Sequence, residues 1–69
     1  MGLTTLGKTI RERRKSLDIT QLQLAELAEI SVNTLYKLER GQSNPTIEVL
    51  VKIAEVLGME LKLEVKQKV

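Results

Sequence analysis

The spacing of the apolar residues constrains this chain most, because it is helical from about residue 5 to residue 57 and then changes. Within that stretch, apolar side chains recur every three or four residues and so share one face of a helix. The predicted fold is all-α: a compact four-helix domain at residues 1–58, followed by a different segment at residues 59–69. The predicted inner faces are Leu6, Ile10 and Leu17 in the first helix, Leu24, Leu27 and Ala28 in the second, Leu35 and Leu38 in the third, and Ile47, Leu50, Ile53, Ala54 and Leu57 in the fourth.

Residues that stabilise helix ends set the predicted boundaries. The first helix should end near Ser16, and Asp18 stands at the following turn, where its short polar side chain tolerates the left-handed conformation. Thr20, with Gln23 three residues later, forms a T-x-x-Q capping box that begins the second helix. The other predicted caps are Ser31 and Thr46 at the starts of the third and fourth helices, and Gly41 and Gly58 at their ends.

After Gly58 the apolar period falls from 3.6 to 2, in the sequence MELKLEVK. This alternation predicts a half-buried strand at residues 59–66. No second strand is predicted elsewhere in the chain, so the strand's backbone groups need a partner, and a second copy of the chain is the simplest one. The predicted dimer interface is Met59, Leu61, Leu63 and Val65. A fifth helical segment and a frayed tail are the alternatives.

The composition excludes several classes of function. The 69 residues include no cysteine and no histidine, so disulfides, thiolate metal sites and the commonest general base are absent. There is also no Gly-rich phosphate loop and no cluster of carboxylates that predicts a pocket. We therefore expect a protein that is not an enzyme, with no catalytic residues, no cofactor and no metal. An RNA-binding function is disfavoured because stacking platforms need several exposed aromatic side chains, and this chain has one.

Charge is unevenly distributed, although the net charge is only +2. Residues 1–17 hold five cations against one anion, whereas the charges of residues 42–69 balance. This asymmetry favours an anionic partner for the first half, usually a nucleic acid, and a solvated helix face is the alternative. No signal-peptide pattern and no apolar run of about 18 residues is present, so we expect a cytoplasmic protein with no membrane partner.

The third predicted helix carries a polar stripe opposite Leu35 and Leu38 that includes the chain's only aromatic residue, Tyr36. Two helices joined by a short turn, the second with such a stripe, match the helix-turn-helix unit, whose second helix enters the DNA major groove. Asn33 suits adenine, Lys37 suits guanine, and Val32 offers a methyl surface to thymine. The predicted base-reading residues are Ser31, Val32, Asn33, Tyr36 and Lys37. The alternative is that Tyr36 packs at a surface edge and the cations keep the domain soluble.

Residues 6–58 resemble the Cro and phage-repressor type helix-turn-helix family, also called XRE-like. The resemblance is carried by T-Q-x-x-L-A, then I-S-x-x-T-L-x-x-L-E-R-G, then N-P-T-x-x-x-L-x-x-I-A-x-x-L-G. It implies a four-helix DNA-binding domain whose second and third helices form the helix-turn-helix. The chain departs from the family at Asp18 and Glu29, where the family most often has glycine at its turns. These changes affect turn stability and leave the base-reading stripe untouched.

Phosphate contacts are expected on both sides of the third helix. Gln21 combines a side-chain amide with free backbone N–H groups in the first turn of the second helix, and the resemblance implies that it contacts the DNA backbone. The full expected set is Thr20, Gln21, Arg40, Gln42 and Asn44, with Arg11 and Lys15 adding to the positive field. The resemblance also implies a structural ion pair between Arg14 and Glu39, which joins the first helix to the end of the third.

A single domain of this size contacts few base pairs, so we expect a homodimer that binds a palindromic operator in double-stranded DNA. The predicted function is a sequence-specific transcriptional regulator, most simply a repressor. The alternative is an antitoxin similar to the HipB-like proteins, which would neutralise a partner toxin and repress its own operon. That alternative is suggested by the L-x-L-x-V segment after the domain. A stand-alone regulator and a controller of a restriction–modification system are also compatible with the sequence.

Overall fold

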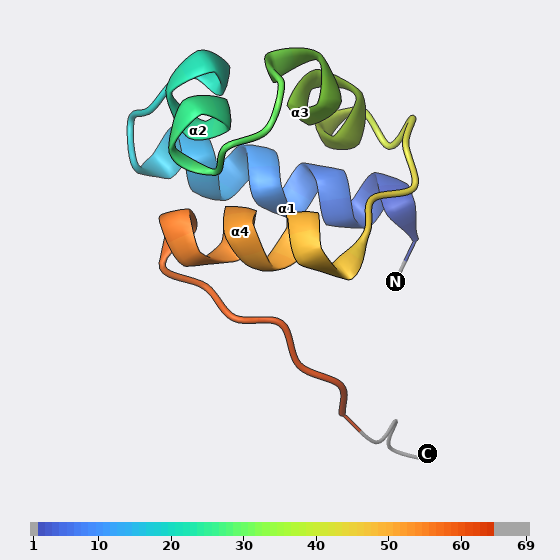
Figure 1. The fold of residues 1–69 in the computed structure, drawn as a ribbon. Coiled ribbons are helices and arrows are strands. Elements are labelled where there is room, and N and C mark those ends of the chain that lie inside the picture. Colours follow the sequence, from blue (N-terminus) through green and yellow to red (C-terminus); the bar gives the residue numbers. More distant parts are fainter. Residues whose placement is uncertain (1, 65–69) are drawn as a thin grey trace.

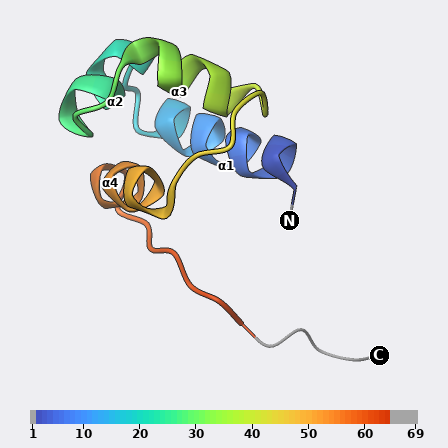
Figure 2. The same cartoon turned by 45° about the vertical axis from the view of Figure 1, so that its right-hand side comes forward.

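A computed structural model describes residues 2–64. Within that range the chain forms four helices, joined by turns and loops, and no strand. The helices are α1 (Leu3–Ser16), α2 (Gln21–Leu27), α3 (Val32–Glu39) and α4 (Ile47–Leu57). In Figure 1, α2 and α3 lie above α1 and α4 lies below it, and α4 also packs against α2. The turned view in Figure 2 shows the same arrangement, with α4 well separated from α3. The predicted all-α, four-helix architecture is therefore confirmed.

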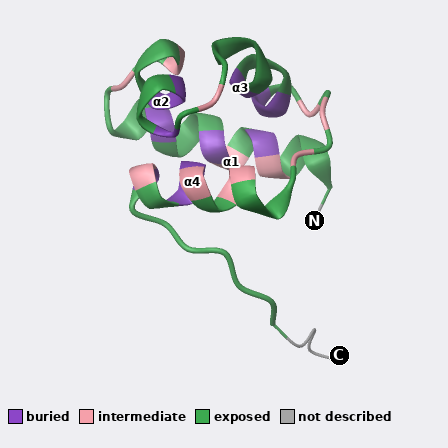
Figure 3. Ribbon diagram, in the orientation of Figure 1, coloured by how far each residue is buried: buried purple, intermediate pink, exposed green. Residues whose placement is uncertain are grey.

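The core is aliphatic and receives side chains from all four helices. Helix α1 contributes Ile10, and the largest fully buried side chains come from the other three helices: Leu24, Leu35, Leu38, Ile53 and Leu57. Buried faces turn toward one another in Figure 3, whereas the C-terminal segment is exposed along its described length. Burial of these side chains supplies most of the stability available to so small a domain.

The predicted helix starts are confirmed. The Thr20 hydroxyl accepts a hydrogen bond from the Gln23 N–H at 3.1 Å, and the Gln23 side-chain oxygen accepts one from the Thr20 N–H at 2.8 Å, which completes the capping box. Ser31 and Thr46 cap α3 and α4 in the same way, each accepting from the backbone N–H three residues later. Each cap satisfies an N–H group that a helix start otherwise leaves without a partner.

The turns on either side of α2 are left-handed at residues other than glycine. Asp18 has φ 60° and Glu29 has φ 58°. The expectation that Asp18 takes this conformation is confirmed, and Glu29 takes it as well. The left-handed conformation costs a residue with a Cβ atom on the order of 1 kcal/mol. Gly41 and Gly58, which follow α3 and α4, have φ 71° and 68° and bear no such cost.

Three residues predicted to be buried are exposed instead: Leu17 (40% exposed), Leu27 (64%) and Ile47 (71%). Leu17 follows the last turn of α1, where the chain already bends away. The buried face of α2 is centred between Leu24 and its i+1 and i+4 neighbours, so Leu27, at i+3, falls just outside it. Ile47 opens α4 at the edge of its buried stripe.

The segment after Gly58 is irregular as far as Glu64, so the predicted strand is not formed within the single chain. Figures 1 and 2 show it leaving the end of α4 and running away from the helices. Leu63 is fully exposed, while Met59 and Leu61 remain about two-fifths exposed. A strand needs a neighbouring strand for its ladder, and residues 2–64 of one chain offer none. Val65, the last residue of the predicted interface, lies outside the described residues.

Candidate nucleic-acid interface

Helix α3 has one face in the core and one face in solvent. Leu35 and Leu38 are fully buried, which fixes the side of α3 that faces the protein. The five residues predicted to read bases are all exposed, on the cap and in the first turns of the helix: Ser31, Val32, Asn33, Tyr36 and Lys37. The Tyr36 side is therefore a surface and not a part of the core, with Tyr36 itself 45% exposed.

Tyr36 contacts a cation one turn further along α3. The Arg40 guanidinium carbon lies 5.3 Å from the centre of the Tyr36 ring. At this distance the positive charge is attracted to the ring face. The contact holds a cation beside the exposed stripe of α3, at the C-terminal end of the helix, where cations are also favoured by the helix dipole.

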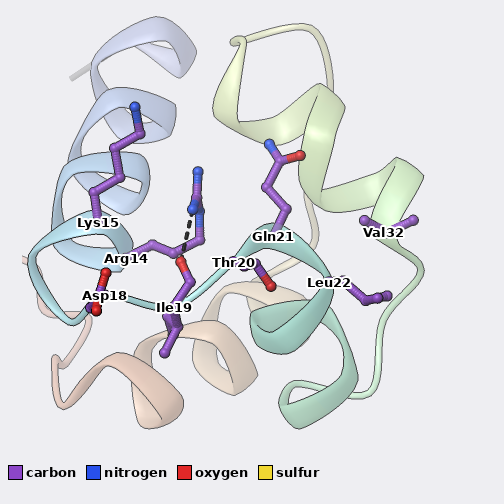
Figure 4. Close-up of a pocket in the computed structure, with 8 residues that line it drawn as sticks. All are labelled: Arg14, Lys15, Asp18, Ile19, Thr20, Gln21, Leu22 and Val32. Atoms are coloured by element: carbon purple, nitrogen blue, oxygen red, sulfur yellow. Dashed lines mark hydrogen bonds between the residues drawn. The ribbon is translucent and has the colours of Figure 1, made fainter.

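Arg14 and Glu39 form a buried, two-point ion pair between α1 and the end of α3. Arg14 Nε lies 2.7 Å from Glu39 Oε2, and Arg14 Nη2 lies 3.0 Å from Glu39 Oε1. The two side chains are only 9% and 1% exposed. The remaining guanidinium nitrogen, Nη1, donates to the Ile19 carbonyl oxygen at 2.9 Å, as Figure 4 shows. The pair thus ties the α1–α2 turn, as well as α1, to α3.

Gln21 joins this network from the first position of α2. Its Nε2 donates to Glu39 Oε1 at 3.0 Å. Glu39 therefore accepts from both α1 and α2, and its own position at the end of α3 is fixed by both. Gln21 was predicted to contact phosphate; the structure shows that one of its amide hydrogens is already committed within the protein, which orients the side chain.

Gly7 lets α1 pass close to the last turn of α3. A Cβ atom at this position would collide with the Leu38 carbonyl oxygen and lie 2.8 Å from the Glu39 carbonyl oxygen. No residue larger than glycine fits without moving one helix. The contact at Gly7 was not predicted, although a glycine inside a helical pattern is a recognised sign of close approach. A second contact that was not predicted fixes α4 to α1: Arg13 Nε donates to the Leu57 carbonyl oxygen at 2.9 Å.

Two neighbouring hollows lie beside the exposed stripe. One, of about 660 Å³, is formed where the end of α1, the start of α2 and the start of α3 meet; Lys15, Thr20 and Val32 line it (Figure 4). The other, of about 520 Å³, is rich in cations and is lined by Arg11, Arg14, Lys15, Gln21, Tyr36, Glu39 and Arg40. The structure thus places Arg11 and Lys15 next to α3. Gln42 and Asn44 are exposed in the loop after α3.

Other kinds of site are not formed by the described residues. Residues 2–64 contain no group of three or more acidic, histidine or cysteine side chains that could hold a metal ion. None of the four helices there has both the length and the apolar character needed to cross a bilayer.

Comparison with known proteins gives related sequences. The chain is 44% identical over 55 residues to an HTH-type transcriptional regulatory protein of Methanococcus maripaludis, covering 80% of this chain and 17% of that protein. It is 39% identical over 57 residues to the immunity repressor protein of Bacillus phage phi105, covering 83% of this chain and 40% of the repressor. The chain thus spans less than half the length of either relative.

Solved structures match over more of their length. The restriction–modification controller protein C.AhdI from Aeromonas hydrophila superposes with a TM-score of 0.82 at 31% identity, over 84% of this chain and 88% of that one. The clp gene regulator ClgR from Corynebacterium glutamicum superposes with a TM-score of 0.80 at 32% identity, over 83% of this chain and 61% of the regulator. A helix-turn-helix family model, HTH_3, matches residues 10–63. The predicted resemblance is confirmed, and the chain belongs to the helix-turn-helix family of the Cro and phage-repressor type.

Proposed function

We propose that this chain is a sequence-specific, double-stranded DNA-binding transcriptional regulator, most simply a repressor, that reads bases with α3 in the major groove. The observation that carries the proposal is the two-sided construction of α3. Its outer face is a continuous exposed stripe of side chains that can contact bases, and its inner end is fixed by the buried Arg14–Glu39 pair. The printed names of its relatives, which include a transcriptional regulatory protein and an immunity repressor, support the same function.

Each residue of the stripe has a chemical role in this proposal. Asn33 donates to and accepts from adenine, and Lys37 donates to the guanine acceptors. Val32 contacts a thymine methyl group, and Ser31 hydrogen-bonds a base edge near the start of the helix. Tyr36 reaches a base or a phosphate with its hydroxyl group, and its ring is held by Arg40 at little cost in side-chain entropy.

The DNA backbone is contacted on both sides of the stripe. Thr20 and Gln21 contact phosphate from the start of α2, and Arg40, Gln42 and Asn44 contact it from the end of α3 and the following loop. The hollow lined by Arg11 and Lys15 adds positive potential between these two groups. Arg14 and Glu39 touch no DNA in this arrangement; they hold α3 at its angle.

We further propose that the regulator binds a palindromic operator as a homodimer. Two copies related by a two-fold axis would read half-sites about 34 Å apart, or a multiple of that distance. The apolar residues Met59, Leu61, Leu63 and Val65 would lie between the copies. The exposure of the first three in the single chain supports this, because apolar side chains gathered at a surface are typical of contact sites.

Selection of bound sequences from a random DNA pool tests the proposed function. The wild-type chain should enrich one motif, and Asn33→Ala and Lys37→Ala should each relax preference at one base position by about 1–3 kcal/mol. Lys52→Ala is the matched control, since Lys52 lies on α4, away from α3, and its only described partner is Glu48. Equal, uniform weakening of all sequences by the α3 variants would assign those residues to phosphate, and no enrichment at all would overturn the proposal.

A further inference from the structure

The outer side of α4 and the C-terminal segment together leave an uncovered apolar groove. Ile47 and Val51 lie one turn apart on α4 and are 71% and 39% exposed. Leu61 and Leu63 follow in the segment that leaves the end of α4. The groove between them has a volume of about 480 Å³ and is lined by Ile47, Leu50, Val51, Leu61, Lys62 and Leu63.

Charges alternate with these apolar residues along the segment. Glu60, Lys62, Glu64 and Lys66 occupy the even positions, and the apolar side chains occupy the odd positions. Lys62 Nζ lies 2.9 Å from Glu64 Oε1, so neighbouring even positions already share one side of the chain. This two-sided segment has the side-chain pattern of a strand with one apolar face and one charged face.

We propose that residues 59–67 of two copies pair antiparallel in a single register, with Leu63 on the two-fold axis; the proposal rests on the homodimer proposed above. In this register Lys62 faces the partner's Glu64, and Glu60 faces the partner's Lys66. Each pair occurs twice because of the two-fold symmetry, so all four charges on each strand meet an opposite charge. Lys66 lies outside the described residues, and its place follows from its position in the sequence.

Other registers satisfy fewer charges. A two-fold axis through Lys62 would place Lys62 against its own copy and Glu60 against the partner's Glu64. An axis through Glu64 would place Glu64 against its own copy and Lys62 against the partner's Lys66. An axis through Leu61 pairs Glu60 with the partner's Lys62 but leaves Glu64 facing a glycine. A shift by one residue would place apolar side chains opposite charged ones. An axis through Val65 would set Lys62 against the partner's Lys68. Directly opposed like charges destabilise a pair of strands, and the register centred on Leu63 is the one that pairs the most opposite charges without opposing like ones.

The same register covers the exposed side of α4. In the proposed register Val65, which lies outside the described residues, would face the partner's Leu61, and Leu61 borders the groove that contains Ile47 and Val51. Each strand therefore carries its last apolar side chain toward the groove of the other copy. The second copy closes the strand edge and covers the apolar stripe of α4 in one contact.

Single cysteines test the register, and the native chain contains none. Leu63→Cys should give a fast disulfide-linked dimer under mild oxidation, since only a residue on the axis faces its own copy at disulfide distance. Leu61→Cys alone should cross-link much more slowly, and Leu61→Cys combined with Val65→Cys should cross-link fast. Fast cross-linking of Leu61→Cys alone would overturn the register centred on Leu63 in favour of one centred on Leu61.

Charge exchange gives an independent test by sedimentation equilibrium. Glu60→Lys sets two lysines against each other twice per dimer and should weaken dimerisation by at least about tenfold. Adding Lys66→Glu should restore the wild-type value, whereas adding Lys62→Glu should not. Restoration by Lys62→Glu instead would overturn the proposed register.

The outcomes separate this inference from the proposed function. A dimer whose cross-links or rescue pattern differ would overturn only the register. A chain that stays monomeric at all concentrations would overturn both the register and the proposed dimer. Loss of motif enrichment in the DNA selection, with cross-linking as expected, would overturn DNA reading and leave the strand pairing in place.

Discussion

Helix α3 and the C-terminal segment differ in what determines their geometry. Helix α3 is fixed by its own chain: Leu35 and Leu38 are fully buried, and Glu39 is held from both α1 and α2. The segment from Met59 to Glu64 is exposed throughout and forms no ladder. The difference teaches that the orientation of the proposed reading helix is encoded within one chain, whereas the proposed strand order of the segment would come from a second chain.

Removing Arg14 should have the largest effect, on the α3 side. Arg14→Ala would leave the Glu39 carboxylate buried beside Gln21 without its guanidinium, which costs about 3–5 kcal/mol of unfolding free energy. Urea denaturation followed by circular dichroism measures this. Arg11→Ala is the control, since Arg11 is an exposed residue on the same helix. The unfolding free energy of this variant should stay near that of the wild type. Wild-type stability of Arg14→Ala together with altered base preference would show that Arg14 reads DNA instead.

Removing residues 59–69 should have the next largest effect, on the other side of the contrast. The shortened chain should sediment as a monomer. Its helices α1–α4 should give the same helical circular dichroism signal as they do in the full chain. Its affinity for a palindromic operator should fall at least about a hundredfold, because the second half-site no longer binds as part of the same complex. A full-length chain that sediments as a monomer would contradict the proposed role of residues 59–69 in forming the dimer.

The turn before α3 allows a gain in stability. Glu29→Gly should raise the unfolding free energy by about 1 kcal/mol, since Glu29 has φ 58° and glycine adopts this conformation without steric cost. Glu26→Gly is the matched control. Glu26 lies within α2, where glycine lowers helix stability by about 1 kcal/mol. A loss of stability from both changes would mean that the Glu29 side chain contributes more than its backbone conformation costs.

The smallest effect is expected at Arg40. Arg40→Gln should reduce the slope of log K against log salt by about 0.9, the value for one lost phosphate contact. It should weaken binding to all sequences alike and leave the selected motif unchanged. Filter-binding titrations at several salt concentrations measure the slope, with Lys52→Ala as a control that keeps it. A change in the motif would instead place Arg40 or its Tyr36 contact against a base.

Local features of the fold were predictable, and longer-range ones were less so. Thr20, Ser31 and Thr46 act within three residues of themselves, so the sequence indicates their caps directly. Leu27 and Ile47 show the limit of prediction from helical spacing. Each lies three positions from a residue of the buried face, and such a position can be either inside that face or just outside it. Which face is buried depends on where the neighbouring helices lie.

The candidate site divides in the same way. The exposed stripe of α3 follows from helical spacing once Leu35 and Leu38 are assigned to the core. The Ile19 carbonyl oxygen and the amide of Gln21 were not foreseen as partners of the buried pair, because both contacts depend on the path of the turn between α1 and α2. The strand at residues 59–66 was inferred from alternation alone, and a single chain contains nothing for it to pair with.

The absence of a side chain at Gly7 has a thermodynamic consequence. Because the α1 backbone packs directly against the last turn of α3 there, the two helices cannot slide past each other, and we expect α1 and α3 to meet DNA as one rigid unit. Calorimetry of complex formation should therefore show a heat-capacity change that matches the area of the contact, with no added contribution from folding coupled to association.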